Sequence, residues 1–312
     1  MATIAIGVDL GGTKIAFAAA DRDGHILATH TEPTLCEQGV EAVIGRIITG
    51  IDQVKGDHLV VGIGLDAPGA VVDGIVINAV NLGWRNVPLV DLVRQRLAAD
   101  LPVWAANDVN ALTFGEMMFG TARGVRDFVY LAVGTGLGGG AVSGGRLING
   151  VNGFAMELGH MSIDPNGRLC ACGNHGCVEM YLAGKGLLAS ANTYLPDYPQ
   201  SVLAGQAITT RAILDAARGN DPLALRVLDQ AADALGQAMA WSVMVINPSL
   251  VVLGGGLGHA AGDLLFAPAA DAMRARLIPE LRPLIRVEPS QVESSALGAA
   301  ALVWHGLDTN GV

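Results

Sequence analysis

The chain has 312 residues, of which 51% are hydrophobic and only 15% are charged, and its formal net charge is −10 at pH 7. Disordered chains are rich in charge and poor in apolar residues, so this composition excludes disorder and predicts a sizeable buried core. The negative charge argues against nucleic acid as a partner, because nucleic acid selects a basic surface. The 42 glycines are roughly twice the ~7% average and, with many Ala, Val and Leu residues, favour an α/β fold with buried strands.

No stretch has the pattern of a membrane span or an export signal. The longest apolar run, 238–253, is interrupted by Asn247 and Pro248, so we expect a helix end followed by a buried strand. The N-terminus has neither a basic segment nor a cleavage site, so we expect no secretion signal. Both observations predict a cytoplasmic protein with no membrane contact, in which clustered thiols indicate metal ligands rather than disulfides.

The first third of the chain predicts strands joined by tight turns, then alternating helices and strands. The expected strands cover 3–8, 15–20, 25–31, 59–65 and 103–106. The expected helices cover 39–54, 88–99 and 109–119, with a loop over 81–86. A glycine turn, 9–14, separates the first two strands, and the next two are joined by a hairpin turn at 21–24.

The same order then restarts, which predicts an internal duplication. A strand over 127–133 leads into a glycine turn over 134–140, and two further short strands follow it. Later helices are expected over 209–217, 222–246, 262–277 and 295–304, and strands over 250–253 and 284–287. We expect the final helix to pack on the N-terminal half. The predicted domains are therefore 1–120 with 295–312, and 121–294.

Three glycine clusters each follow an apolar strand. The cluster Gly134–Gly139 matches G-x-G-x-x-G, but that fingerprint must open a helix, and the residues after it favour a strand and hairpin instead. No P-loop pattern occurs. Alone, each cluster is as well explained by an ordinary hairpin. Together they favour turns in which backbone N–H groups and a Thr hydroxyl approach phosphate oxygens, with Gly254–Gly256 bordering a nucleotide base.

Two aspartates at strand ends are candidates for chemistry. Asp108 follows a strand beside Asn107, where a carboxylate can deprotonate a substrate hydroxyl. The alternative is a helix N-cap, a role that Asp and Asn both favour. Asp9 has the same ambiguity, since it can hold a turn in place or bind Mg²⁺ through water.

Residues 153–181 hold three of the four cysteines, two histidines and two isolated glutamates. The pattern His-x9-Cys-x-Cys-x4-Cys, formed by His160, Cys170, Cys172 and Cys177, suits a tetrahedral Zn²⁺ ion. His175 competes with His160 as the fourth ligand, but its place between two cysteines should direct it outward. Cys36 lies far away in the sequence and is expected to be a buried thiol.

Taken together, these segments resemble the ROK family of sugar kinases, within the actin-like ATPase superfamily. The resemblance spans most of the chain in the family's order. It is carried by Asp9–Lys14, Asn107–Asp108, Gly134–Gly140, Glu157–His160 and Cys170–Glu179. It implies an α/β fold of two actin-like, ribonuclease H-like domains with a cleft between them. One departure is Met156, where relatives usually carry Gly or Ala.

The resemblance also implies roles for individual residues. Asp108 would be the catalytic base of an ATP:hexose 6-phosphotransferase. The sugar would be bound by Gly69, Asn81, Asn107, Asp108, Glu157, His160 and Glu179. ATP and its Mg²⁺ would be bound by Asp9, Gly11, Gly12, Thr13, Lys14, Gly134, Thr135, Gly136, Gly138, Gly255 and Gly256. A structural Zn²⁺ would be bound by His160, Cys170, Cys172 and Cys177.

Glucose is the expected substrate, because the loop 81–89 looks most like that of the family's bacterial glucokinases. Fructose, mannose, allose and N-acetylmannosamine remain alternatives. The family also contains sugar-responsive repressors, whose DNA-binding domain precedes the segment equivalent to Asp9–Thr13, and only eight residues precede Asp9 here. A non-catalytic sugar-binding protein is a further alternative. The resemblance implies a homodimer or homotetramer.

Overall fold

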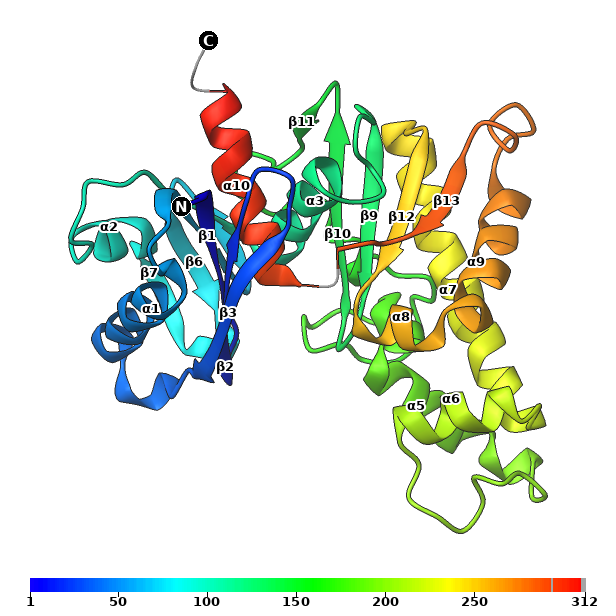
Figure 1. Cartoon of the computed structure of the whole chain (residues 1–312). Helices are drawn as coiled ribbons and strands as arrows, with labels where there is room; N and C mark the ends of the chain where they lie inside the picture. Colours follow the sequence, from blue (N-terminus) through cyan, green and yellow to red (C-terminus); the bar gives the residue numbers. More distant parts are fainter. Residues whose placement is uncertain (293, 310–312) are drawn as a thin grey trace. The chain divides into compact units, whose positions relative to one another are not determined.

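The computed structural model describes residues 1–292 and 294–309, and the chain divides into two compact units (Figure 1). The first unit contains Met1–Val125, Leu147–Ala155 and the described residues of Ser290–Val312. The second contains Arg126–Arg146 and Met156–Pro289. The domain boundaries given above stay a prediction. Among the described residues, no helix combines the length and the apolar character needed to cross a membrane.

The first unit is built on a five-stranded sheet of order β3-β2-β1-β4-β8. β2 pairs antiparallel with both β1 and β3, whereas β1, β4 and β8 run parallel. The strands are β1 (Thr3–Leu10), β2 (Lys14–Ala20), β3 (Ile26–Pro33), β4 (Leu59–Ala67) and β8 (Val103–Asn107). Because the carboxyl ends of parallel strands meet at one edge of a sheet, the residues that end β1, β4 and β8 are neighbours.

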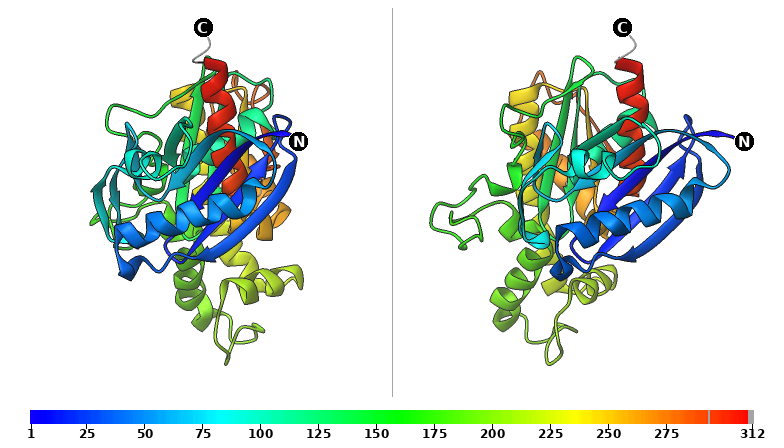
Figure 2. Two further views of the ribbon diagram at one scale, coloured as in Figure 1. Left: turned by 60° about the vertical axis from the view of Figure 1, so that its left-hand side comes forward. Right: turned by 90° about the vertical axis from the view of Figure 1, so that its left-hand side faces the viewer.

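Helices cover both faces of this sheet (Figure 2). On one face, α1 (Val40–Lys55) packs its buried Val and Ile side chains on large apolar residues of the strands. On the other face lies α10 (Ser295–Thr309), which also contacts α3 (Asp108–Met118). A Cβ added to Gly7 or Gly64 would lie 1.8 or 1.9 Å from a carbonyl oxygen of α10, so only glycine allows this close approach. The prediction that the final helix returns to the N-terminal half is confirmed.

Smaller elements complete the first unit. They are η1 (Cys36–Gln38), η2 (Val80–Leu82), α2 (Leu89–Arg94) and a three-stranded sheet of β5 (Ala70–Val72), β6 (Ile75–Ala79) and β7 (Trp84–Val87). The predicted loop over 81–86 is wrong in part, because β7 pairs with β6 and buries Trp84 and Val87. The helix predicted over 88–99 is also shorter, since it ends at Arg94.

The second unit repeats the strand order of the first. Its sheet has the order β11-β10-β9-β12-β13, in which β9 pairs antiparallel with β10, and β12 lies parallel to both β9 and β13. The strands are β9 (Phe128–Val133), β10 (Leu137–Ser143), β11 (Arg146–Leu147), β12 (Leu250–Gly254) and β13 (Arg286–Pro289). The repeat predicted from the glycine turns is therefore present in the topology.

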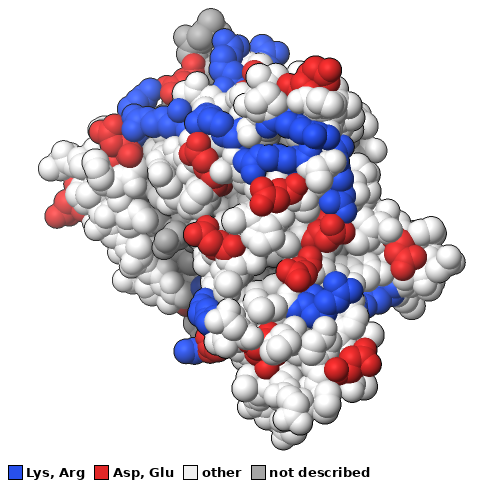
Figure 3. Space-filling view, turned by 90° about the vertical axis from the view of Figure 1, so that its right-hand side faces the viewer, with Lys and Arg blue, Asp and Glu red and all other residues white. Residues whose placement is uncertain are grey.

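The remaining elements of the second unit are mostly helical. They are η3 (Leu158–His160), α4 (Glu179–Leu182), α5 (Gly184–Tyr194), η4 (Leu195–Asp197), α6 (Thr210–Arg218), α7 (Pro222–Ile246), α8 (Gly256–Ala261) and α9 (Asp263–Arg276). The bounds predicted for α7 are confirmed. The helix expected over 262–277 is preceded by the separate α8, so Gly256 begins a helix instead of lying in a loop. Figure 3 shows basic and acidic side chains side by side over the face it presents. Two ion pairs of the second unit are Arg276–Asp233 and Arg286–Glu288, at 2.6 and 2.9 Å.

A buried carboxylate lies where the chain passes between the units. Glu116 of α3 is fully buried, and its Oε2 accepts a hydrogen bond of 2.7 Å from the backbone N–H of Thr121. Its Oε1 accepts from the Ser290 hydroxyl and from the N–H groups of Gln291 and Val292. A buried carboxylate with four donors is well stabilised. Glu116 therefore holds the segments before Val125 and after Pro289, where the chain changes unit.

Candidate active site

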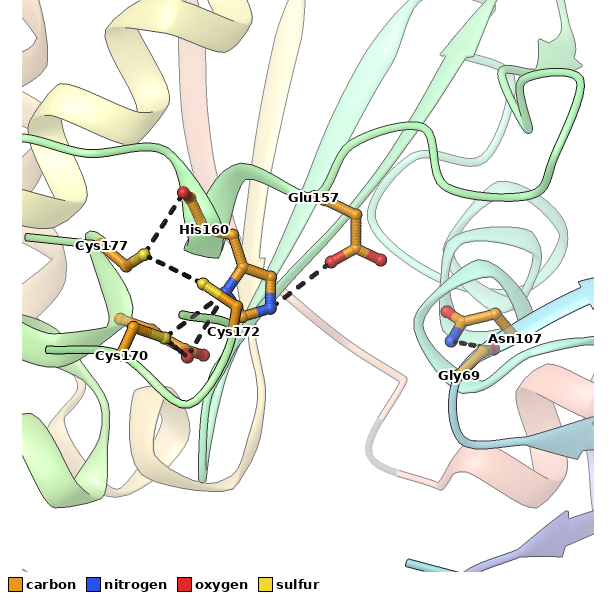
Figure 4. Close-up of polar contacts among 8 residues, drawn as sticks. Gly69, Asn107, Glu157, His160, Cys170, Cys172 and Cys177 are labelled. Carbon is orange, nitrogen blue, oxygen red and sulfur yellow. Dashed lines mark hydrogen bonds and ion pairs between the residues drawn. The ribbon is translucent and has the colours of Figure 1, made fainter. Parts of the chain in front are cut away.

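Asn107 and Asp108 begin α3 at the carboxyl end of β8. The Asn107 side-chain oxygen accepts hydrogen bonds from the N–H groups of Val109 (2.9 Å) and Asn110 (3.3 Å), which makes Asn107 the N-cap. Its amide nitrogen donates to the carbonyl of Gly69 at 3.0 Å (Figure 4). The alternative that Asp108 caps the helix is therefore wrong. Asp108 accepts one hydrogen bond, from Val109 N–H at 2.9 Å, and is half-buried.

Two further aspartates end the neighbouring strands. Asp9 of β1 lies directly opposite Asp66 of β4, and the next residue of β4 is opposite Asn107. Asp66 is fully buried; its carboxyl oxygens accept no hydrogen bond from an N–H group of the described residues, and its side-chain partner is the Asp9 carboxyl group. The sequence analysis did not select Asp66 as a site residue. The available signal was its place directly after a buried strand, which is the signal that selected Asp108.

Burial and mutual repulsion change the proton affinity of these acids. Burial, together with the nearby charges of Asp9 and Asp108, raises the pKa of Asp66 well above its ordinary value. Burial also raises the pKa of Asp9, against the opposing effects of the Asp66 carboxyl group and Lys14. The pKa of Asp108 is raised by burial and by Asp9, although the hydrogen bond from Val109 N–H opposes this. A base with a raised pKa takes up a proton more readily.

The first glycine turn lies next to these acids. Gly11 N–H donates to the Lys14 carbonyl at 3.0 Å, which closes the turn, and Thr13 and Lys14 are exposed. A Cβ on Gly12 would lie 3.0 Å from two atoms of Asn81, so the close contact favours glycine. Asn81, a predicted sugar ligand, thus lies against the predicted phosphate turn. Cys36, expected to be buried, is half-buried, with its Sγ 3.7 Å from the Gly12 carbonyl oxygen.

The structure brings the other two glycine clusters together in the second unit. Gly134 N–H donates to the Gly136 carbonyl at 2.9 Å, which leaves the exposed Thr135 at the tip of the turn. Gly255 has φ of +86°, and a Cβ there would lie 2.4 Å from the carbonyl oxygen of Val133, the residue before this turn. Gly138 lies in β10, and Gly256 is the first residue of α8. Glycine is thus required where backbone approaches backbone.

The three cysteines and His160 form one group in the second unit (Figure 4). One ligand atom from each of His160, Cys170, Cys172 and Cys177 lies within 4.8 Å of all the others. His175 is outside this group, and its Nδ1 contacts the Gly167 carbonyl at 3.0 Å. The structure therefore favours His160 over His175 as the fourth ligand.

The donors of this group suit Zn²⁺. Three sulfurs and one imidazole nitrogen are the ligands of a closed structural zinc site. The hydrogen bond from Asn174 N–H lowers the pKa of Cys172 to about 7, so this exposed thiol readily supplies a thiolate. Burial raises the pKa of Cys170 to about 12, and its Sγ donates to Glu179 at 3.1 Å. A bound cation would remove the protons from all three thiols.

The two predicted sugar-binding glutamates lie beside this group. Glu179 Oε1 is 3.6 Å from His160 Nδ1, and Glu157 Oε2 is 4.0 Å from His160 Nε2. Glu179 also limits the second glycine turn, since a Cβ on Gly136 would lie 2.8 Å from its Oε2. Glu179 therefore contacts the cysteine group and also lies next to the glycine turn at Gly134–Gly136.

Met156, which departs from the family pattern, has an unusual backbone conformation. Its φ is +68°, in the left-handed region that favours glycine. Its carbonyl accepts from Leu158 N–H at 2.7 Å, so the chain turns sharply around Glu157. With Trp241 and other largely apolar residues, Met156 lines a cavity of about 240 Å³. A strained backbone next to a candidate ligand is typical of functional sites.

Comparisons with known proteins show the family to which the chain belongs. The ROK family model matches residues 5–305. The chain is 36% identical over 308 residues to a glucokinase of Thermotoga maritima, an alignment that covers 96% of each chain. The structure matches that of a ROK family glucokinase from Streptomyces griseus in complex with glucose and AMPPNP, with a TM-score of 0.81, 36% identity, and coverage of 96% of this chain and 98% of that one.

A regulator has the same fold. A ROK family transcriptional regulator, a homologue of the E. coli MLC protein, matches with a TM-score of 0.88 and 27% identity. The match covers 98% of this chain and 79% of the regulator. The two-domain actin-like fold predicted from the sequence is confirmed by these neighbours, but the fold alone does not distinguish a kinase from a regulator.

Proposed function

Because the chain belongs to the ROK family, we propose that it is an ATP-dependent hexose kinase that phosphorylates a primary hydroxyl, with glucose as its substrate. The observation that carries this proposal is that the Asp108 carboxyl group is not used as the helix cap and has a raised pKa. Asn107 caps α3, so Asp108 is not needed as a cap, and its pKa is raised as a general base requires. The similarity to glucokinases over nearly the whole chain supports the choice of substrate.

In the proposed reaction, Asp108 accepts the proton of the sugar hydroxyl while that oxygen forms a bond to the γ-phosphorus of ATP. The bond from this phosphorus to the bridging oxygen breaks, and ADP leaves with the electron pair. Backbone N–H groups of the turns at Gly11–Thr13 and Gly134–Gly136 stabilise the phosphate charge. Positioning and these charges contribute most of the acceleration, and the base adds roughly 10²–10⁴-fold.

The proposed ligands divide by unit. In the first unit, Gly69, Asn81 and Asn107 bind sugar hydroxyls, while Asp9, Thr13 and Lys14 serve ATP and its cation. In the second, Glu157, His160 and Glu179 bind the sugar, and Gly138, Gly255 and Gly256 line the nucleotide site. A Mg²⁺ ion, when bound with ATP, would neutralise charge on the phosphates. A structural Zn²⁺ would be bound by His160, Cys170, Cys172 and Cys177.

The test is ADP release from Mg-ATP across a panel of hexoses, including glucose, fructose, mannose, allose and N-acetylmannosamine. We expect turnover that is highest with glucose, and an Asp108→Asn variant at least about 10²-fold slower that still binds the sugar in calorimetry. Near-normal turnover in this variant would remove Asp108 from its role. Sugar binding without turnover on any hexose would instead favour a sugar-responsive regulator.

A further inference from the structure

Asp66 is a buried acid that the proposed reaction does not use. It lies on β4 directly opposite Asp9 of β1, and Asp108 begins α3 after the next strand, β8. Paired residues on neighbouring strands lie on the same face of a sheet, with strands about 4.8 Å apart. The backbone register alone therefore brings the carboxyl groups of Asp9 and Asp66 together, at the end of β1 where the phosphate turn Gly11–Thr13 begins.

The surroundings of Asp66 are unfavourable for a carboxylate. Its side chain is fully buried, and the group that reaches it is another acid, the Asp9 carboxyl group, with which it shares a hydrogen bond when one of the two is protonated. The charged groups that act on it are two more acids, Asp9 and Asp108. Burying an unpaired carboxylate costs several kcal/mol. Such a group needs either a proton or a cation as its partner.

We propose that Asp66, together with Asp9, directly binds the divalent cation of the kinase reaction, an inference that rests on the proposed function. Carboxylate oxygens are the ligands that Mg²⁺ prefers, and Mg²⁺ commonly takes one or two carboxylates with phosphate oxygens and water. Two carboxylates at the start of a phosphate turn provide that combination. The pair would place the cation's positive charge beside the phosphates held by the turn.

The three acids do not form a single metal-binding group. Among the described residues, Asp9, Asp66 and Asp108 do not form a group with all ligand atoms within 4.8 Å, unlike the cysteine group. Asp108 is therefore not assigned to the cation and stays available as the base. The candidate ligands are all carboxylates, with no thiolate or imidazole among them. Such a ligand set favours Mg²⁺ or Mn²⁺ over Zn²⁺.

The test measures Mn²⁺ binding without nucleotide, from the loss of the free-ion signal in electron paramagnetic resonance, on the full chain. We expect Asp66→Asn to weaken Mn²⁺ binding at least about 10-fold, the effect typical of losing a residue that supports a metal site. The matched control is Asp91→Asn, which removes an exposed acid of α2 paired with Arg94 and should leave Mn²⁺ binding unchanged. Circular dichroism and sugar binding of each variant confirm that it is folded.

A second measurement tests whether Asp66 binds a cation or only carries a proton. In the kinase assay, Asp66→Asn should raise the Mg²⁺ concentration for half-maximal turnover at least about 10-fold with little change in the KM for the sugar. If Asp66 only carries a proton, the isosteric amide will leave both Mn²⁺ binding and the Mg²⁺ requirement unchanged, and the proposal is wrong. Failure of the proposed function would show differently, as no turnover in the hexose panel, while the Mn²⁺ measurement would still decide the role of Asp66.

Discussion

At the scale of single residues, the protonation of Asp108 gives a measurable pH dependence. Burial and the neighbouring Asp9 raise its pKa above the ordinary value of about 3.9. A general base must be unprotonated, so kcat/KM should fall as pH decreases through this raised pKa, which places the acid limb above pH ~4. The measurement is the pH profile of kcat/KM for the sugar.

The control for the acid limb of this pH profile is the residual activity of Asp108→Asn, which should not change over the same pH range. A limb that persists in this variant would show that the acid limb does not belong to Asp108. Circular dichroism at each pH excludes acid unfolding as the cause of the lost rate.

The sequence predicted Asp108 and Asp9 but not Asp66, for a physical reason. The place of Asp66 at a strand end was visible in the sequence, but the pairing that sets it opposite Asp9, and so distinguishes it from other strand-end residues, depends on strand order. The backbone strain at Met156 could not be predicted from the sequence either. Its identity was visible as a departure from the family, but its φ of +68° follows from contacts made by the folded chain.

At the scale of elements, the cysteine group predicts that metal and sugar binding are coupled. His160 belongs to the proposed Zn²⁺ site and lies 3.6 Å from Glu179, which also contacts Cys170. Removing the ion with a chelator should therefore loosen both proposed sugar ligands. We expect at least about 10-fold weaker hexose binding in calorimetry, before the rest of the protein unfolds.

A pair of cysteine variants provides the matched comparison. Cys172→Ser removes one ligand of the group and should reproduce the effect of the chelator, with zinc content lost in elemental analysis. Cys36→Ser changes a thiol outside the group and should leave zinc content unchanged. Full hexose affinity in the metal-free protein would disprove the coupling.

Element positions were predictable where the pattern was strong and local. The bounds of α7 were correct because a long apolar repeat starts at an Asp221 cap and ends at Asn247. The strand Trp84–Val87 was missed, since its pairing with β6 is what makes those four residues a strand. Likewise, α8 was missed, because the helix was expected to begin only at Gly262, and the glycines that precede and begin α8 do not favour a helix.

At the scale of the whole molecule, the last helix completes the first unit. α10 rests on Gly7 and Gly64 of the N-terminal sheet, where an added Cβ would meet backbone. Gly64→Ala should therefore force α10 from the sheet and lower the free energy of unfolding by about 1–3 kcal/mol, the usual cost of overpacking. Urea-induced unfolding measures this change.

The same substitution at Gly45 serves as its control. Gly45 lies in the middle of α1, and a Cβ there would contact nothing within 4 Å. Alanine is a better helix former than glycine, so Gly45→Ala should raise the free energy of unfolding by about 0.5–1 kcal/mol. Equal effects of the two substitutions would contradict the role given to Gly64.

The repeated sheet carries two kinds of strand end on one strand order. By position in the repeat, β1 and β4 correspond to β9 and β12. In one copy these strands end in the carboxyl groups of Asp9 and Asp66, and in the other they lead into the bare backbone of Gly134 and Gly254–Gly255. One copy of the repeat thus presents two carboxyl groups at its strand ends, whereas the other presents backbone without side chains.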